Sequence, residues 1–148
     1  MVLISKEDIA RWVTSLPQLE GFNWSAEIGI TEQEMVVPLV GPAYWQQLKT
    51  EQANAQFTEP SLALMQLLTP AMAFYTAYLA LPSLLLLQPE EERWNAKIAQ
   101  ERRNHYLSRA RFYAQQVLQL VGEKPADYPL VNPITALLLK NFPVFIPN

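Results

Sequence analysis

The chain of 148 residues contains no cysteine and a single histidine, His105. Without cysteine it can form no disulfide, thiolate metal site or cysteine nucleophile. One histidine, with no carboxylate-rich loop of calcium-binding spacing, also argues against a metal centre. No nucleophile-elbow motif surrounds any serine. We therefore expect no catalytic residue, no metal and no cofactor, and we predict that the protein is not an enzyme.

Glycine and charge are scarce as well. Four glycines stand against twelve prolines, which leaves little room for a phosphate-cradling loop and favours stiff connections between helices. Charged residues make up 17% of the chain and hydrophobic residues 50%. Such a composition needs an apolar core, a membrane or partner subunits to cover its apolar surface. The net charge of −3 gives no overall electrostatic attraction to nucleic acid.

Helix-start signals organise the first third of the chain. Ser5 followed by Asp8 has the spacing of a capping box and predicts a helix over about 6–15. Gly41 can adopt the left-handed conformation that ends a helix, and Pro42 is well placed as the first residue of the next one. These signals predict short helices joined by tight, proline-bounded turns.

The central stretch from Pro60 to Pro89 carries no formal charge. Thr58 precedes it as a capping residue, so we expect a helix over about 59–81 that ends at Pro82 or after a short second piece, SLLLLQ. About 20 apolar residues suffice to cross a membrane. Internal prolines, polar side chains and acidic flanks on both sides favour instead the buried centre of a helical bundle. A small membrane-associated protein anchored through 60–89 remains the alternative.

A second long helix is predicted over about 89–121, because proline and glycine are absent between Pro89 and Gly122. Its apolar residues recur at intervals of 4, 3, 4 and 3 and would pack on the central helix; they are Tyr106, Ala110, Tyr113, Val117 and Leu120. The fold is therefore predicted to be all-α with four to five helices. Residues 1–122 would form the helical domain, and 123–148 a proline-rich, extended C-terminal arm of the same structural unit.

Two features are candidates for contact with partners. The first is a polar contact strip on the long helix, formed by Arg102, Arg103, Arg109 and Arg111. Only Glu101 opposes six basic residues between positions 93 and 111, which gives this span a local charge of +5. The strip would face an acidic partner or nucleic acid, or it is a solvated face with salt bridges to acids elsewhere in the chain.

The second candidate is the C-terminal PVFIPN. Its large apolar side chains are costly to leave in water; with the preceding residue they are Phe142, Val144, Phe145 and Ile146. The segment either docks on a neighbouring subunit or folds back onto its own core, and the sequence leaves both open.

Four stretches of the chain resemble small helical proteins from the structural-gene clusters of tailed phages and prophages, the head–tail connector or neck adaptor family. They are MVLISKEDIARWV, MVVPLVGPAYWQQL, LLTPAMAFYTAYLALPSL and RRNHYLSRARFYAQQVLQLV. Together they cover about two thirds of the chain, and they are patterns of helices rather than catalytic motifs.

The resemblance implies a structural virion protein, made in the cytoplasm of a bacterial host and placed in the neck of the particle. It implies a homo-oligomeric ring, a dodecamer in many members, that contacts the portal and other neck or tail proteins. DNA would pass through the ring as cargo without specific binding, and no membrane would be involved. A soluble helical protein-binding module, such as a regulator or chaperone, is the alternative in a different class.

Overall fold

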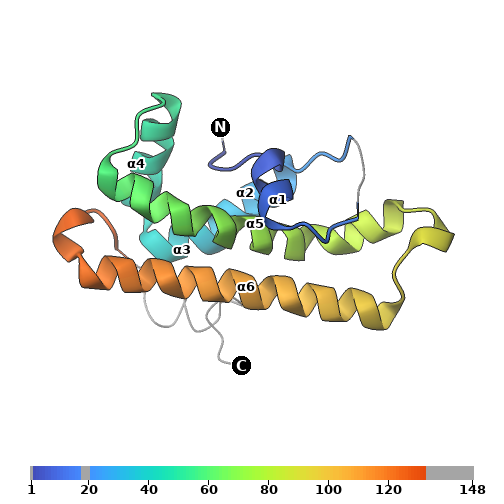
Figure 1. Ribbon diagram of the computed structural model, residues 1–148. Helices are drawn as coiled ribbons and strands as arrows, with labels where there is room; N and C mark the ends of the chain where they lie inside the picture. The colour runs from blue at the N-terminus through green and yellow to red at the C-terminus, as the bar shows by residue number, and fades with distance from the viewer. Residues whose placement is uncertain (1, 18–20, 133–148) are drawn as a thin grey trace.

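The structure is a computed structural model that describes residues 2–17 and 21–132 (Figure 1). Within these ranges it is helical and contains no β-strand, which confirms the predicted all-α class. The helices are α1 (Lys6–Trp12), α2 (Ser25–Thr31), α3 (Val37–Val40), α4 (Pro42–Ala53), α5 (Glu59–Leu87) and α6 (Ala96–Glu123). A π-helical segment, Glu32–Val36, joins α2 to α3, so these form one continuous helix and the described part has five.

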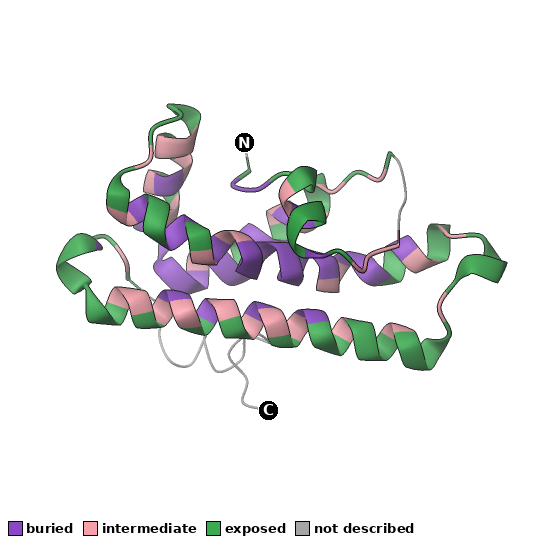
Figure 2. Ribbon diagram, in the orientation of Figure 1, coloured by how far each residue is buried: buried purple, intermediate pink, exposed green. Residues whose placement is uncertain are grey.

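The long helix α5 forms the centre of the molecule. In Figure 1, α6 runs antiparallel along one side of α5, while α1 and α2 lie on the other. Figure 2 shows that buried residues line α5 and the inner face of α6, whereas the outer face of α6 is exposed. The middle of α5, from Pro70 to Ala77, is buried without interruption. The predicted packing of the long helix on a central apolar helix is therefore confirmed.

Helix α5 is longer than predicted because it continues through Pro82 to Leu87. Proline lacks the backbone N–H that would bond the carbonyl four residues earlier, here that of Tyr78. Arg103 of α6 supplies a substitute donor, since its Nε lies 3.4 Å from the Tyr78 carbonyl oxygen. The Arg103 guanidinium also lies 4.4 Å from the centre of the Tyr78 ring. The side chain of Arg103 thus stabilises α5 at the proline.

By length and composition alone, α5 could cross a membrane. In the structure, 61% of its most apolar 18-residue window is buried against the rest of the chain. A helix that is apolar on all sides is also typical of the centre of a bundle.

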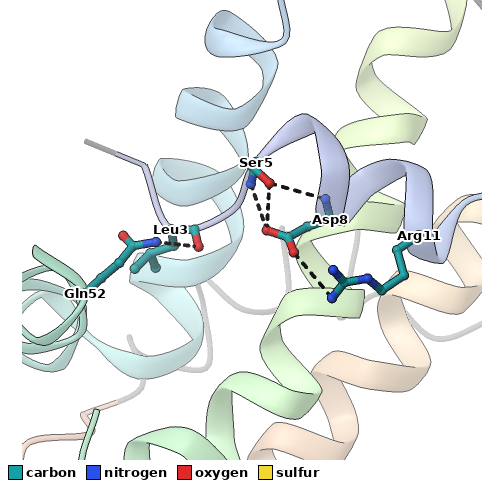
Figure 3. Close-up of polar contacts among 5 residues, drawn as sticks. All are labelled: Leu3, Ser5, Asp8, Arg11 and Gln52. Carbon is teal, nitrogen blue, oxygen red and sulfur yellow. Dashed lines mark hydrogen bonds and ion pairs between the residues drawn. The ribbon is translucent and has the colours of Figure 1, made fainter. Parts of the chain in front are cut away.

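The predicted helix caps of the first half are present. Ser5 Oγ accepts a hydrogen bond from the backbone N–H of Asp8, and the Asp8 carboxylate accepts one from the N–H of Ser5 (Figure 3). Gly41 has a φ of +88° and a ψ of 155°, a conformation that only glycine adopts readily but not the left-handed helical one predicted, and α4 begins at Pro42. Thr58 caps α5 by accepting from the N–H of Ser61. Helix α1 ends at Trp12 rather than near residue 15.

The long helix α6 begins later than predicted, at Ala96 instead of about 89. Glu90–Glu92 form only one 3-10 turn. Arg93 then bends the chain back, because its guanidinium donates to the carbonyl oxygens of Gln88 and Leu86, each at 3.0 Å. The side chain of Asn95 caps the new helix by accepting from the N–H of Ile98 at 2.9 Å.

A buried carboxylate pins the N-terminal segment to the bundle. Glu32, in the π-helical segment, is 2% exposed. Its carboxylate accepts hydrogen bonds from the N–H of Leu3 and from Trp45 Nε1, both at 2.9 Å, and lies 3.3 Å from Lys49 Nζ. Gln52 Nε2 donates to the Leu3 carbonyl at 3.0 Å (Figure 3). Both backbone polar groups of Leu3 are thus bonded to side chains.

The beginning of the predicted arm returns to the helices. Tyr128 is 3% exposed, and its hydroxyl donates to the Pro60 carbonyl at 2.8 Å. Asn132 N donates to the Val40 carbonyl at 2.9 Å. The apolar residues of the predicted arm, from Phe142 to Ile146, lie outside the described residues.

Candidate interaction surface

One flank of α6 carries a row of side chains that mixes cations with apolar groups. We call this row the α6 strip, and its members are Ile98, Arg102, His105, Arg109 and Phe112. Their spacing of 4, 3, 4 and 3 places them on one side of the helix. Ile98 is 40% exposed and Phe112 46% exposed, although both are apolar. The strip therefore presents apolar surface and positive charge together.

Aromatic rings surround the guanidinium of Arg109. Its central carbon lies 5.2 Å from the ring centre of Tyr113, 5.3 Å from that of Phe112 and 5.9 Å from that of Phe74. Its Nη2 also donates to the Tyr113 hydroxyl at 3.1 Å. Cation–π contacts of this kind attract the guanidinium to the rings and hold it in one place. Arg109 is consequently a fixed cation rather than a freely moving one.

Two tryptophans extend the strip. The guanidinium of Arg102 lies 5.9 Å from the ring centre of Trp94, which precedes α6. Trp12, from α1, meets Tyr113 edge to face with ring centres 5.7 Å apart, and it is 36% exposed. Trp94 lies just before α6, whereas Trp12, like Phe74, comes from a segment remote in sequence from the middle of α6. Packing of α1 and α5 against α6 therefore assembles the surface.

The positive charge of the strip is not neutralised by acids of the described part of the chain. Among residues 2–17 and 21–132 there are two ion pairs within 4 Å, Arg11–Asp8 and Lys49–Glu32. Neither involves α6. The sequence left open a solvated helix face with salt bridges to acids elsewhere in the chain. Arg102 and Arg109 form no such salt bridge with any described residue.

The four arginines predicted to form one contact strip do not share one face. Arg102 and Arg109 lie on the α6 strip, whereas Arg103 points toward Tyr78 of α5. Arg111 follows Arg109 by two residues, which is about 200° around a helix of 3.6 residues per turn and thus nearly the opposite side. The helical spacing of Ile98, His105 and Phe112 is a sequence signal that could have distinguished Arg102 and Arg109 from Arg103 and Arg111.

A chain of hydroxyl and carboxyl groups between α4 and α5 has the residue types of a proton relay. Tyr44 Oη lies 2.8 Å from Ser61 Oγ, which donates to Glu51 at 2.9 Å. However, Tyr44 is 2% exposed and Ser61 is fully buried, so a substrate could not reach either oxygen. Burial raises the pKa of Tyr44 to about 12. The arrangement ties two helices together.

His105 is exposed at the middle of the α6 strip. Its ring centre lies 6.4 Å from that of Phe74 and 6.2 Å from that of Tyr106. Among the described residues, no group of three or more histidine, aspartate and glutamate side chains is placed to hold a metal ion.

Comparison of the chain with models of protein families, with curated proteins and with solved structures finds no match in any of the three. The class of the protein is therefore defined by its own architecture. It is an all-α bundle whose long outer helix presents a surface of cations and aromatic rings.

Proposed function

We propose that the protein is a structural subunit that assembles with further copies of itself into a ring, as a head–tail connector or adaptor of a phage neck. The observation that carries the proposal is the α6 strip. Arg102 and Arg109 are held against aromatic rings but have no acidic partner among the described residues. A surface built in this way is suited to binding another protein.

The residue types of the strip support an interface. Arginine, tryptophan and tyrosine are enriched among the residues that contribute most to binding between proteins. Ring contacts already hold Arg109 in place, so less side-chain freedom is lost when a partner binds. The strip also lies on a helix of 28 residues that packs along α5, a rigid support for a contact that must bear load.

The connector class is supported by where the family-like stretches fall. They coincide with the N-terminal segment and α1, with α3 and α4, with α5 and with α6, which are the elements that form the bundle. In this proposal the copies close into a ring that meets the portal and other neck proteins, and DNA passes through without specific contacts. The net charge of −3 suits a channel to which DNA does not adhere.

The proposed placement is the virion neck rather than a membrane. It is supported by the packing of α5 against α1, α2 and α6, which buries 61% of its most apolar window. The C-terminal segment with Phe142 and Phe145 is proposed as a second contact with an adjacent subunit.

The test is the mass of the full chain, purified without detergent, by light scattering after gel filtration, both alone and with the portal protein of the same gene cluster. A complex of many copies, seen as a ring by electron microscopy, is expected in at least one condition. A chain of 16.9 kDa that stays monomeric in both would refute the proposal and favour a monomeric binding module. A product recovered only from membranes would favour the anchored alternative.

A further inference from the structure

The corner between α5 and α6 carries the negative charge that the α6 strip lacks. We call it the acidic corner, and it consists of Leu86, Leu87, Glu90, Glu91 and Glu92. The three glutamates are exposed and form no ion pair with any described residue. Leu86 is 72% and Leu87 57% exposed, the two highest values among the large apolar side chains of the described chain.

The neighbouring cation forms no ion pair with the glutamates of this corner. Arg93 is the residue next to the three glutamates, but its guanidinium donates to the backbone carbonyls of Gln88 and Leu86 at the end of α5. Its position is therefore set by the helix end. The acidic corner thus presents carboxylates beside exposed leucines, while the α6 strip presents guanidinium groups beside exposed Phe112 and Ile98.

We infer that the acidic corner of one copy binds the α6 strip of the next copy. This inference rests on the proposed function and names the surface through which the copies meet. The carboxylates of the corner pair with Arg102 and Arg109, which lie about 10.5 Å apart along the helix. Leu86 and Leu87 cover the apolar side chains of the strip. Each surface supplies the charge and the apolar area that the other leaves uncovered.

The acidic corner cannot reach the middle of the α6 strip of its own chain. Arg93 and the Asn95 cap fix the corner at the N-terminal end of α6. Arg109 lies 13 residues beyond Ala96, about 20 Å further along a rigid helix at 1.5 Å per residue. A corner can therefore cover the middle of the strip only on a different copy. Because two different surfaces meet, the contact is head to tail and closes into a ring or grows as a filament.

The test uses two charge-reversal variants of the full chain. The corner variant carries Glu90→Lys, Glu91→Lys and Glu92→Lys, and the strip variant carries Arg102→Glu and Arg109→Glu. We expect each variant alone to associate about a hundredfold more weakly than the unchanged protein, since close like charges oppose the contact. Because the side chains of the corner glutamates are exposed and form no ion pair with a described residue, the corner variant should fold normally, which circular dichroism would verify.

A mixture of the two variants tests whether opposite charges restore the contact. Each mixed pair joins surfaces of opposite charge, so equal amounts of the two variants should form a complex in which they alternate. A chain that carries all five reversals should associate with itself again. The matched control is Lys97→Glu with Lys124→Glu, which alters net charge as much as the strip variant does and lies at exposed positions outside the strip. The control should associate like the unchanged protein.

The outcomes separate this inference from the proposed function. If the unchanged protein assembles and both reversal variants assemble equally well, the corner and the strip are not the interface, although the proposed function stands. If the unchanged protein does not assemble at all, with or without the portal, the proposed function itself fails. Loss in each variant with recovery in the mixture supports both.

Discussion

Removal of the Glu32 carboxylate should destabilise the protein more than any surface substitution. The Glu32→Ala change leaves the N–H of Leu3 and the Nε1–H of Trp45 without an acceptor in the core. A hydrogen bond to a charged group contributes about 1.5–3 kcal/mol, so the two bonds suggest a loss of about 3–6 kcal/mol. The Lys49 side chain is 25% exposed and can turn its charge to water, which limits the further cost. We expect a loss of about 3–5 kcal/mol, in the range for breaking a buried pair.

Urea unfolding followed by circular dichroism would measure this loss as a lower midpoint with an unchanged slope. Glu32→Gln keeps one carbonyl acceptor and should lose about half as much. Gln33→Ala, at an exposed neighbouring position in the same π-helical segment, is the matched control and should change stability by less than about 0.5 kcal/mol. If Glu32→Ala were as stable as this control, Glu32 would not be what holds the N-terminal segment in place.

Three further substitutions test other contacts. Gly41→Ala should lose about 1–3 kcal/mol by thermal unfolding, because a side chain there is strained at φ +88° and would meet the backbone of the returning C-terminal segment; unchanged stability would contradict the close approach. Tyr44→Phe should lose about 1 kcal/mol at neutral pH, while the unchanged protein loses stability as the pH rises from 10 to about 12, where the tyrosine ionises only when unfolded; equal pH dependence in both proteins would contradict this assignment. Arg103→Met should lose about 1–2 kcal/mol because the Tyr78 carbonyl is left without a donor. Pro82→Ala supplies a new N–H to that carbonyl, so it should stabilise the Arg103→Met variant more than it stabilises the unchanged chain. Additive effects of the two changes would refute the idea that Arg103 replaces the donor missing at Pro82.

Local signals predicted most of the helix starts. The caps at Ser5, Thr58 and Pro42 act over three residues or fewer, so the sequence alone specifies them. The start of α6 was placed too early because Glu90–Glu92 satisfy the rule for a first helical turn. What overrides that rule is Arg93, whose bonds to the end of α5 require the chain to turn before α6 begins.

Tertiary contacts explain what the sequence could not show. Proline normally ends a helix, but α5 continues past Pro82 because a side chain from α6 bonds the freed carbonyl. The candidate surface was only partly predictable for a related reason. The arginines are visible in the sequence, yet the rings of Phe74 and Trp12 that complete the strip come from α5 and α1. Nothing local in the sequence brings Phe74 beside Arg109 or Trp12 beside Tyr113.

The most direct test of the central claim, that the α6 strip contacts a second copy, is a photo-crosslinking measurement. A photoreactive amino acid replaces His105, which is exposed at the centre of the strip. Unlabelled protein with this substitution is mixed with isotope-labelled protein without it, and crosslinked peptides are identified by mass spectrometry. We predict crosslinks that join an unlabelled strip to a labelled chain. Crosslinks confined to single chains, at concentrations where the protein assembles, would contradict the account.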